Sequence, residues 1–210
     1  MNTLNDLFDL YGSDKGSAKH NYGPVYESYL EPFRQYSVNL LEIGVLRGSS
    51  MRAWRDYFPD AKLWGLDIDP RSTAHMQNEH GINLMIGSQD DNSVLDRLAS
   101  DAGDGFDIII DDGSHMVDHI IASLTFLFPL MHPGGIYIVE DLLESYHADA
   151  AEFRKWSGMH LNPKLPNNRR CLLDRLFNGW IRTMDHGRGD LESIHFHREL
   201  VVLRKNRTRL

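Results

Sequence analysis

Five short apolar segments, separated by helical segments, constrain the fold of this chain most strongly. They are NLLEI (39–43), KLWGLD (62–67), INLMIG (82–87), FDIIID (106–111) and GGIYIVE (134–140). Strands that alternate with helices are typical of a mostly parallel sheet with helices on both faces. The closing segment ESIHFHRELVVLRK predicts two further strands around residues 197–199, so we expect the sheet to end in an antiparallel hairpin.

Two regions depart from this alternation. Residues 1–36 begin with an amphipathic stretch at 4–10, which continues into a loop rich in Gly and Ser and then a second helical stretch. Residues 143–190 lack a strand pattern, but the apolar spacing at 172–184 predicts a core-facing helix. We therefore expect a single domain over 1–210, with residues 1–36 as a helical lid segment and residues 143–190 as an insertion.

Composition narrows the class of protein. The chain has 210 residues, 41% of them hydrophobic and 25% charged, which fits one globular domain with a good core. Its net charge of -8 argues against a nucleic-acid partner, because binding to phosphates requires a basic surface. The single cysteine, Cys171, permits no intrachain disulfide and implies no oxidising compartment. Without a signal-like or membrane-spanning apolar run, we expect a cytoplasmic protein without a membrane partner.

Acidic residues follow the last two predicted parallel strands directly. IIIDDGSH ends in Asp111-Asp112 with His115 three residues beyond, and IYIVEDL ends in Glu140-Asp141. Neighbouring parallel strands bring their carboxyl ends to one edge, so these carboxylates should converge. Converging carboxylates repel each other unless a hard cation lies among them. A histidine beside such a cation is well placed to take a proton from a metal-bound hydroxyl group.

Several alternatives apply to these residues. Asp111 could be the ligand in place of Asp112, although strand alternation puts the two on opposite sides and so makes one of them structural. Glu140 and Asp141 could instead cap the segment that follows. His119 lies one helical turn after His115, but the glutamate of an HExxH zinc motif is absent, so we interpret His119 as support or packing.

The first strand leads into a glycine-containing turn that opens a helix. Gly44 and Gly48 let a ligand approach the backbone, and the helix beginning near Ser49 exposes free amide groups. The GxGxxG fingerprint of dinucleotide-binding sites is absent. Glu42 brings a negative charge into the turn, which disfavours a pyrophosphate and suits a cationic ligand such as S-adenosylmethionine.

Polar residues also follow the second and third strands. Asp67 is placed to accept the two ribose hydroxyls of a nucleoside, and Ser88 and Gln89 suit an adenine edge. Each signal is weak alone, because an aspartate after a strand is often a helix cap. Their order at the ends of three successive strands predicts an adenosine-containing cofactor on the edge where open α/β sheets bind ligands.

Seven stretches together carry a family resemblance that spans nearly the whole chain: GSDKG with HNY, LLEIGVLRGSS, GLDIDP, GSQDD, IIIDDGSHMVDH, LFPLMHPGGIYIVEDL and FHRELVVLRK. The sequence resembles class I S-adenosylmethionine-dependent O-methyltransferases that require a divalent metal, in particular the mycinamicin and macrocin group of antibiotic sugar O-methyltransferases. The pair DDGSH and PGGxYxxEDL is its most specific part. The resemblance implies an α/β, Rossmann-like class I methyltransferase sheet.

The resemblance also implies a mechanism and a set of site residues. Mg²⁺, or Mn²⁺ in its place, would be held by Asp112, Glu140 and Asp141 and would bind two adjacent sugar hydroxyls, lowering the pKa of the one that reacts. His115 would be the general base for methyl transfer from S-adenosylmethionine. The residues expected at the cofactor site are Glu42, Gly44, Gly48, Ser49, Asp67, Ser88, Gln89 and Asp111, together with His20 and Tyr22 from the N-terminal loop. A solvated loop is the alternative for the last two.

The sequence gives less information about the molecule that would accept the methyl group. The larger members of the group carry an additional N-terminal domain that residues 1–210 do not include. Residues 143–190 should form much of the acceptor pocket for a glycoside, either an antibiotic deoxysugar or a polysaccharide such as a methylmannose polymer. Four aromatic side chains could stack on a sugar, although core packing is the default for such residues: His147, Trp156, His160 and Trp180. Relatives of this kind imply a homodimer or homotetramer.

Three other functions compete with this one. A nicotinamide-dependent oxidoreductase would use the same type of sheet, but the missing GxGxxG motif argues against it. A protein like the cephalosporin hydroxylases would be expected to use a two-histidine, one-carboxylate iron site, whereas three carboxylates favour Mg²⁺. The third is a binding module without catalysis.

Overall fold

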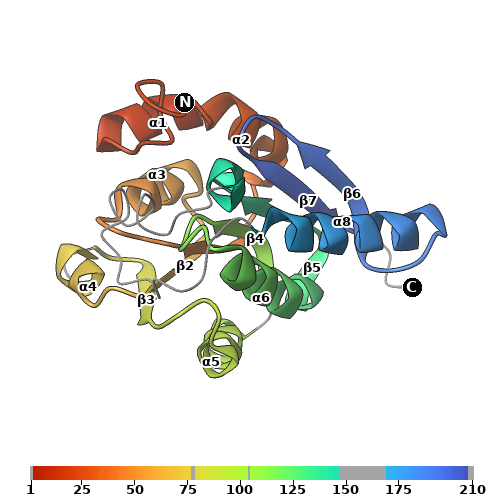
Figure 1. The fold of residues 1–210 in the computed structure, drawn as a ribbon. Helices are drawn as coiled ribbons and strands as arrows, with labels where there is room; N and C mark the ends of the chain where they lie inside the picture. The colour runs from red at the N-terminus through yellow and green to blue at the C-terminus, as the bar shows by residue number, and fades with distance from the viewer. Residues whose placement is uncertain (1, 77–78, 104, 147–168, 208–210) are drawn as a thin grey trace.

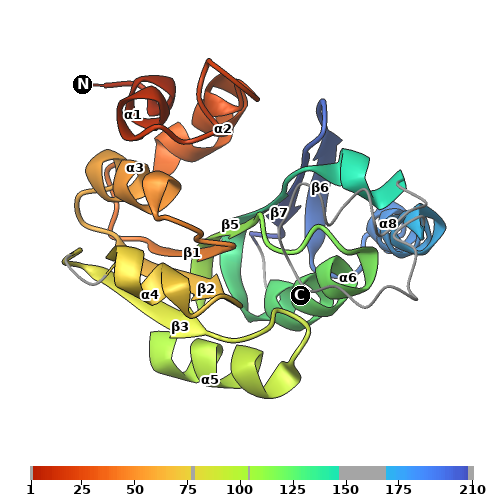
Figure 2. The same ribbon diagram turned by 60° about the vertical axis from the view of Figure 1, so that its left-hand side comes forward.

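The computed structural model describes residues 2–76, 79–103, 105–146 and 169–207, which form a seven-stranded sheet with helices on both faces (Figures 1 and 2). The strand order is β3-β2-β1-β4-β5-β7-β6. Strands β1 to β5 pair in parallel, β7 runs antiparallel to β5, and β6 runs antiparallel to β7. The predicted mostly parallel sheet with an antiparallel C-terminal hairpin is therefore confirmed.

The strands lie where the apolar runs predict them. Their bounds are Asn39–Ile43 (β1), Lys62–Asp67 (β2), Ile82–Ile86 (β3), Phe106–Asp111 (β4), Met131–Val139 (β5), Leu191–Phe196 (β6) and Val201–Lys205 (β7). Strand β5 begins at Met131 instead of Gly134, because Met131 pairs with Phe106 before the register shifts. The Pro-Gly-Gly sequence therefore lies within an irregular strand and not in a turn before it.

The helices divide into two layers. Helices α1 (Leu4–Tyr11), α2 (Gly23–Leu30), α3 (Ser49–Tyr57) and α4 (Arg71–Met76) belong to one layer, and α5 (Asn92–Ala102), α6 (Val117–Leu127) and α8 (Arg170–Asp185) to the other. Three short 3-10 turns complete the described elements: η1 (Glu31–Phe33), η2 (Phe128–Leu130) and η3 (Leu142–Tyr146). Successive residues of β4 alternate between the two cores, with Ile108 and Ile110 in the first and Ile109 in the second.

The N-terminal segment forms a helical pair on the first layer. Thr3 and Asp6 form a capping box at the start of α1, and Gly12 ends that helix in the left-handed conformation. Helix α2 ends at Leu30 and passes into the 3-10 turn that contains Pro32. Between α1 and α2 the chain crosses the carboxyl edge of the sheet.

Helix α8 belongs to the core of the second layer. It buries Leu173 and Phe177, and Trp180 packs on Phe128 with ring centroids 5.0 Å apart. The predicted core-facing stripe is thus confirmed, and Trp180 is a packing residue. The candidate sugar-stacking residues His147, Trp156 and His160 lie outside the described residues, so their role remains a prediction.

Candidate active site

The turns after β1 and β4 touch each other at the carboxyl edge of the sheet. The amide of Asp112 donates a hydrogen bond of 3.0 Å to the carbonyl of Ile43. Gly44 has φ +89°, and a Cβ atom at this position would lie 2.0 Å from the carbonyl oxygen of Asp112. Only glycine combines this backbone conformation with such a close approach.

We expect Gly44→Ala to destabilise the fold more than Gly12→Ala. Gly12 also has a positive φ (+65°), but a Cβ there would meet nothing within 4 Å, so its replacement costs only the left-handed backbone, about 1–2 kcal/mol. At Gly44 the clash adds about 1–3 kcal/mol of strain. Urea unfolding of the two variants measures the difference. Equal losses of stability would show that the two turns can move apart freely.

Asp111 and Asp112 point to different surroundings, as strand alternation predicts. Asp111 is buried and accepts hydrogen bonds from Gln89 Nε2 (2.9 Å), Ser123 Oγ (2.6 Å) and Tyr137 OH (3.1 Å). Gln89 Oε1 accepts from the amide of Ser114 (2.7 Å). Asp111 and Gln89 thus form an internal network that holds the turn after β4. Direct contact of either residue with a cofactor remains a prediction.

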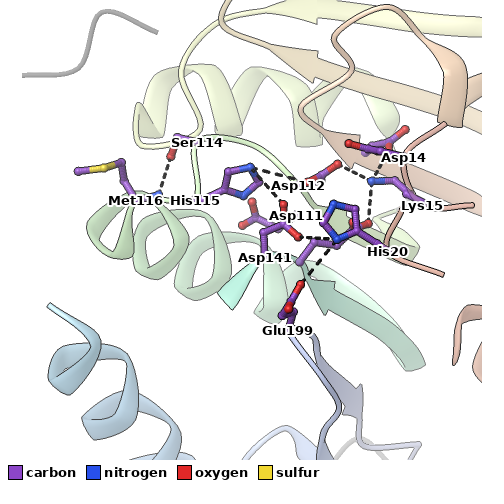
Figure 3. Close-up of polar contacts among 12 residues, drawn as sticks. Asp14, Lys15, His20, Asp111, Asp112, Ser114, His115, Met116, Asp141 and Glu199 are labelled. Atoms are coloured by element: carbon purple, nitrogen blue, oxygen red, sulfur yellow. Dashed lines mark hydrogen bonds and ion pairs between the residues drawn. The ribbon is translucent and has the colours of Figure 1, made fainter. Parts of the chain in front are cut away.

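Asp112 lies on the edge of the sheet beside His115 and Asp141 (Figure 3). His115 Nε2 is 3.9 Å from Asp112 Oδ1 and 3.9 Å from Asp141 Oδ2, and one ligand atom of each of the three residues lies within 4.8 Å of the others. Two carboxylate oxygens form a donor set that suits a hard divalent cation. We call these three residues the first cluster.

A second cluster shares Asp141 with the first. It consists of His20, Asp141 and Glu199, with His20 Nδ1 3.6 Å from Glu199 Oε2 and 3.9 Å from Asp141 Oδ1. His115, Asp141 and Glu199 all have positive φ values, of +55°, +51° and +64°. Such conformations are uncommon outside glycine and concentrate at functional sites.

Glu140, the third predicted metal ligand, belongs to neither cluster and is held by hydrogen bonds inside the protein. It is buried, and its Oε1 accepts hydrogen bonds from Lys15 Nζ (2.8 Å) and from Tyr26 OH. Burial, and then the negative charge of Asp112, hold the pKa of Glu140 well above its usual value. Burial also raises the pKa of Asp112, and the ammonium of Lys15 offsets part of that rise. Burial is thus the main cause of both shifts, and neighbouring carboxylates add to it.

Lys15 is a buried cation at the centre of these carboxylates. Its side chain is 2% exposed, and its Nζ also binds Asp112 Oδ2 (Figure 3). The same Nζ lies 3.7 Å from Glu42 Oε1. Burial alone lowers the pKa of a lysine, but the carboxylates of Asp112, Glu140 and Glu42 together hold the pKa of Lys15 well above its usual value. Sequence reasoning missed this residue, because a lysine in a Gly-rich loop is usually exposed.

Three tyrosines of the N-terminal segment reach toward the strand ends and the C-terminal hairpin. Tyr22 OH donates to Asp141 Oδ1 (2.8 Å), Tyr26 OH donates to Glu140, and Tyr29 OH lies 2.8 Å from a ring nitrogen of each of two histidines, His195 and His197. The sequence positions 22, 26 and 29 put them on one face of α2. That spacing is the signal in the sequence that identifies them. His20, a member of the second cluster, stacks its ring on that of Tyr22 with centroids 4.9 Å apart.

Apart from His20 and Tyr22, which lie at the second cluster, the predicted cofactor residues fall into two groups. Gly44, Gly48, Ser49, Asp67 and Ser88 lie at the ends of the adjacent strands β1, β2 and β3 or at the start of α3. Asp67 accepts hydrogen bonds from the amides of Leu46 (2.7 Å) and Asp69 (2.8 Å), which bridges two of these ends. Ser88 donates to Asp90.

Glu42 belongs to the second group, whose members are buried and form hydrogen bonds inside the protein, as Asp111 and Gln89 do. It is fully buried and accepts hydrogen bonds from Ser50 Oγ (2.8 Å) and Trp54 Nε1 (3.2 Å). Burial raises the pKa of Glu42 to about 7, although the ammonium of Lys15 opposes the rise. Direct recognition of a cationic ligand by Glu42 remains a prediction, since the structure gives its carboxylate partners inside the protein.

Comparison with known proteins decides the family. Residues 41–142 match the model of a methyltransferase domain. This part of the chain belongs to the methyltransferase family. The match spans both turns of the candidate site, and it does not favour the oxidoreductase or hydroxylase alternatives.

This methyltransferase is similar to proteins that are named as O-methyltransferases. It is 34% identical to 8-demethyl-8-(2-methoxy-alpha-L-rhamnosyl)-tetracenomycin-C 3'-O-methyltransferase of Streptomyces olivaceus, over 97% of this chain and 54% of the relative. It is 38% identical to mycinamicin VI 2''-O-methyltransferase of Micromonospora griseorubida, over 68% of this chain and 37% of the relative. The chain thus spans about half, or less, of the length of these relatives.

A solved structure agrees in fold and sequence. MycE methyltransferase from the mycinamycin biosynthetic pathway, in complex with Mg and SAH, superposes with a TM-score of 0.78 and 29% identity, over 98% of this chain and 54% of that chain. Among the described residues of this methyltransferase, no helix is long and apolar enough to cross a membrane.

Proposed function

We propose that this methyltransferase transfers the methyl group of S-adenosylmethionine to a sugar hydroxyl of a glycoside, with the help of a divalent cation. The observation that carries the proposal is the first cluster, in which Asp112, His115 and Asp141 meet at the carboxyl edge of the sheet beside the Gly44 turn. The relatives support it, because they are named as O-methyltransferases of a rhamnosyl-tetracenomycin and of mycinamicin VI, and a MycE structure contains Mg, SAH and mycinamycin VI.

The residues present fit a magnesium ion. Asp112 and Asp141 each offer an oxygen to one point, and Glu140 follows β5 immediately before Asp141. Oxygen ligands of this kind are those that Mg²⁺ prefers, and Mn²⁺ accepts them too. When bound, the cation lowers the pKa of a coordinated hydroxyl group. Asp112, Glu140 and Asp141 would hold it.

His115 would remove the proton of the sugar hydroxyl. Its ring is 18% exposed and so remains accessible from the edge of the sheet, while the two carboxylates at 3.9 Å stabilise the positive charge that the ring gains with the proton. The deprotonated oxygen would then attack the methyl carbon in line, while the bond between that carbon and the sulfonium sulfur breaks and S-adenosylhomocysteine leaves. The protein contributes chiefly orientation of the two reactants and removal of the proton.

S-Adenosylmethionine would bind along the ends of β1, β2 and β3. The amides at the start of α3, the Gly44 turn and Asp67 lie on this edge, and Asp67 retains acceptor capacity for ribose hydroxyls beside its two backbone bonds. Acceptors would be glycosides, either antibiotic deoxysugars or polysaccharides. A homodimer or homotetramer and a cytoplasmic location remain part of this proposal.

A transfer assay tests the proposed function. The protein is incubated with S-adenosylmethionine carrying an isotope-labelled methyl group and a panel of glycosides with adjacent hydroxyls. We expect label on a sugar oxygen in the presence of Mg²⁺, loss of transfer in excess chelator and recovery when Mg²⁺ is restored. Transfer at the same rate in chelator, or label on nitrogen or carbon, would contradict the proposal.

A further inference from the structure

Lys15 contacts two of the three proposed metal ligands, Asp112 and Glu140, without belonging to either cluster itself. It comes from the loop between α1 and α2, far in sequence from the strand ends it binds. A lysine that is 2% exposed is expensive to bury unless it is paired, and here every charged partner within reach is a carboxylate of the site.

Lys15 contacts only one oxygen of Asp112 and one oxygen of Glu140. Lys15 Nζ binds Asp112 through Oδ2, whereas Oδ1 of Asp112 is the atom that lies 3.9 Å from His115 Nε2 in the first cluster. At Glu140 the hydrogen bonds from Lys15 and Tyr26 both end on Oε1, and neither involves Oε2. The N-terminal segment thus fixes one oxygen of each carboxylate and leaves the other for a ligand.

We propose that Lys15, assisted by Tyr26, is a positioning residue of the metal site. Its ammonium ties Asp112 and Glu140 together, so that their second oxygens face the cation, and it offsets the repulsion that would drive the two carboxylates apart. The inference rests on the proposed function, because it assumes that these carboxylates hold the metal. Outer partners of metal ligands orient them and usually contribute about 10–100-fold in affinity.

Charge does not prevent a cation from binding beside Lys15. A bound cation requires its ligands Asp112, Glu140 and Asp141 to be ionised, and these three negative charges exceed the single positive charge of Lys15, which leaves a net charge of about −2 to attract a divalent ion. The opposing view is that Lys15 occupies the place of the metal and competes with it. The two views predict opposite effects of removing the ammonium.

The test measures metal affinity instead of activity. The full chain is titrated with Mn²⁺, followed by the loss of the electron paramagnetic resonance signal of free aqueous Mn²⁺, and displacement by Mg²⁺ gives the second affinity. For Lys15→Met we expect both affinities to fall about 100-fold. Tyr26→Phe, which removes one hydroxyl and keeps the ring, should lower them about 10-fold.

Lys19→Met is the matched control. Lys19 lies in the same loop, but it is exposed and pairs with Asp14 at 3.0 Å, so its replacement should leave the metal affinities unchanged. Thermal unfolding of each variant confirms that it is folded. A merely structural lysine would lower the unfolding temperature of Lys15→Met without changing the metal affinity.

The outcomes separate the two proposals. Tighter metal binding by Lys15→Met would show that Lys15 competes with the metal, and unchanged affinity in both Lys15→Met and Tyr26→Phe would show that neither residue positions the ligands; either result overturns the inference. If Lys15→Met fails to fold, the affinity of Tyr26→Phe decides. Absence of metal binding by the wild-type protein would overturn the proposed function itself, and the inference with it.

Discussion

Replacement of His115 by asparagine is expected to reduce methyl transfer by about 10²–10⁴-fold, the usual contribution of a general base. Asparagine adopts the left-handed backbone conformation that His115 has (φ +55°), so the change removes the base without straining the turn. S-Adenosylmethionine affinity should stay at the wild-type value, because His115 lies at the end of β4 and the predicted cofactor residues follow β1 to β3. Single-turnover rates with labelled cofactor measure the effect.

His119→Asn provides the control for this experiment. His119 lies in α6, whereas His115 precedes that helix with a left-handed backbone, and Nε2 of His119 faces Asp90 at 3.3 Å, outside both clusters. We expect this variant to transfer methyl groups at nearly the wild-type rate. If His115→Asn stays within about threefold of wild type, a contribution of the size expected of a general base is absent and His115 is not that base.

Asp141→Asn should abolish metal-dependent activity. Asp141 is the residue that the two clusters share, with Oδ2 toward His115 and Oδ1 toward His20. The substitution keeps the shape of the side chain and suits the left-handed backbone (φ +51°), but it removes a negative charge and an anionic ligand oxygen. We expect the Mg²⁺ affinity to fall by more than the ~10–100-fold that is usual for the loss of an outer partner.

The control for Asp141→Asn is another aspartate on the same edge of the sheet. Asp69 follows β2, pairs with Arg71 and belongs to neither cluster. Asp69→Asn should bind Mg²⁺ as the wild type does. Calorimetric titration with Mg²⁺ compares the two variants, and equal affinities would show that Asp141 does not hold the cation.

The sheet could be predicted from the sequence because its strands are buried on both faces. A doubly covered strand such as β4 is apolar at successive positions, as Ile108, Ile109 and Ile110 show, and this run is visible without any structure. The carboxylates that follow β4 and β5 were equally visible, because parallel neighbours must bring their ends together. Strand alternation alone also predicted that Asp111 and Asp112 point to opposite sides, and in the structure Asp111 is buried while Asp112 lies at the edge of the sheet.

The contribution of the N-terminal segment could not be predicted in the same way. Lys15 and Tyr26 reach Glu140 from more than 100 positions away in the sequence, and Glu199 arrives from the opposite end of the chain in the hairpin. No local pattern encodes such contacts, because they depend on how α1 and α2 pack on the sheet. For the same reason the hydrogen bonds that Glu42 and Gln89 make inside the protein could not be predicted, and their contact with the cofactor stays a prediction.

The measurement that tests the central claim most directly is calorimetric titration of S-adenosylmethionine into the purified protein, first with Mg²⁺ and then with excess chelator. We predict saturable binding in both conditions, because the proposed cofactor site along β1 to β3 is separate from the carboxylates after β4 and β5. Absence of binding in both conditions would contradict the claim that this methyltransferase uses S-adenosylmethionine, and the carboxylate clusters would then require a different explanation.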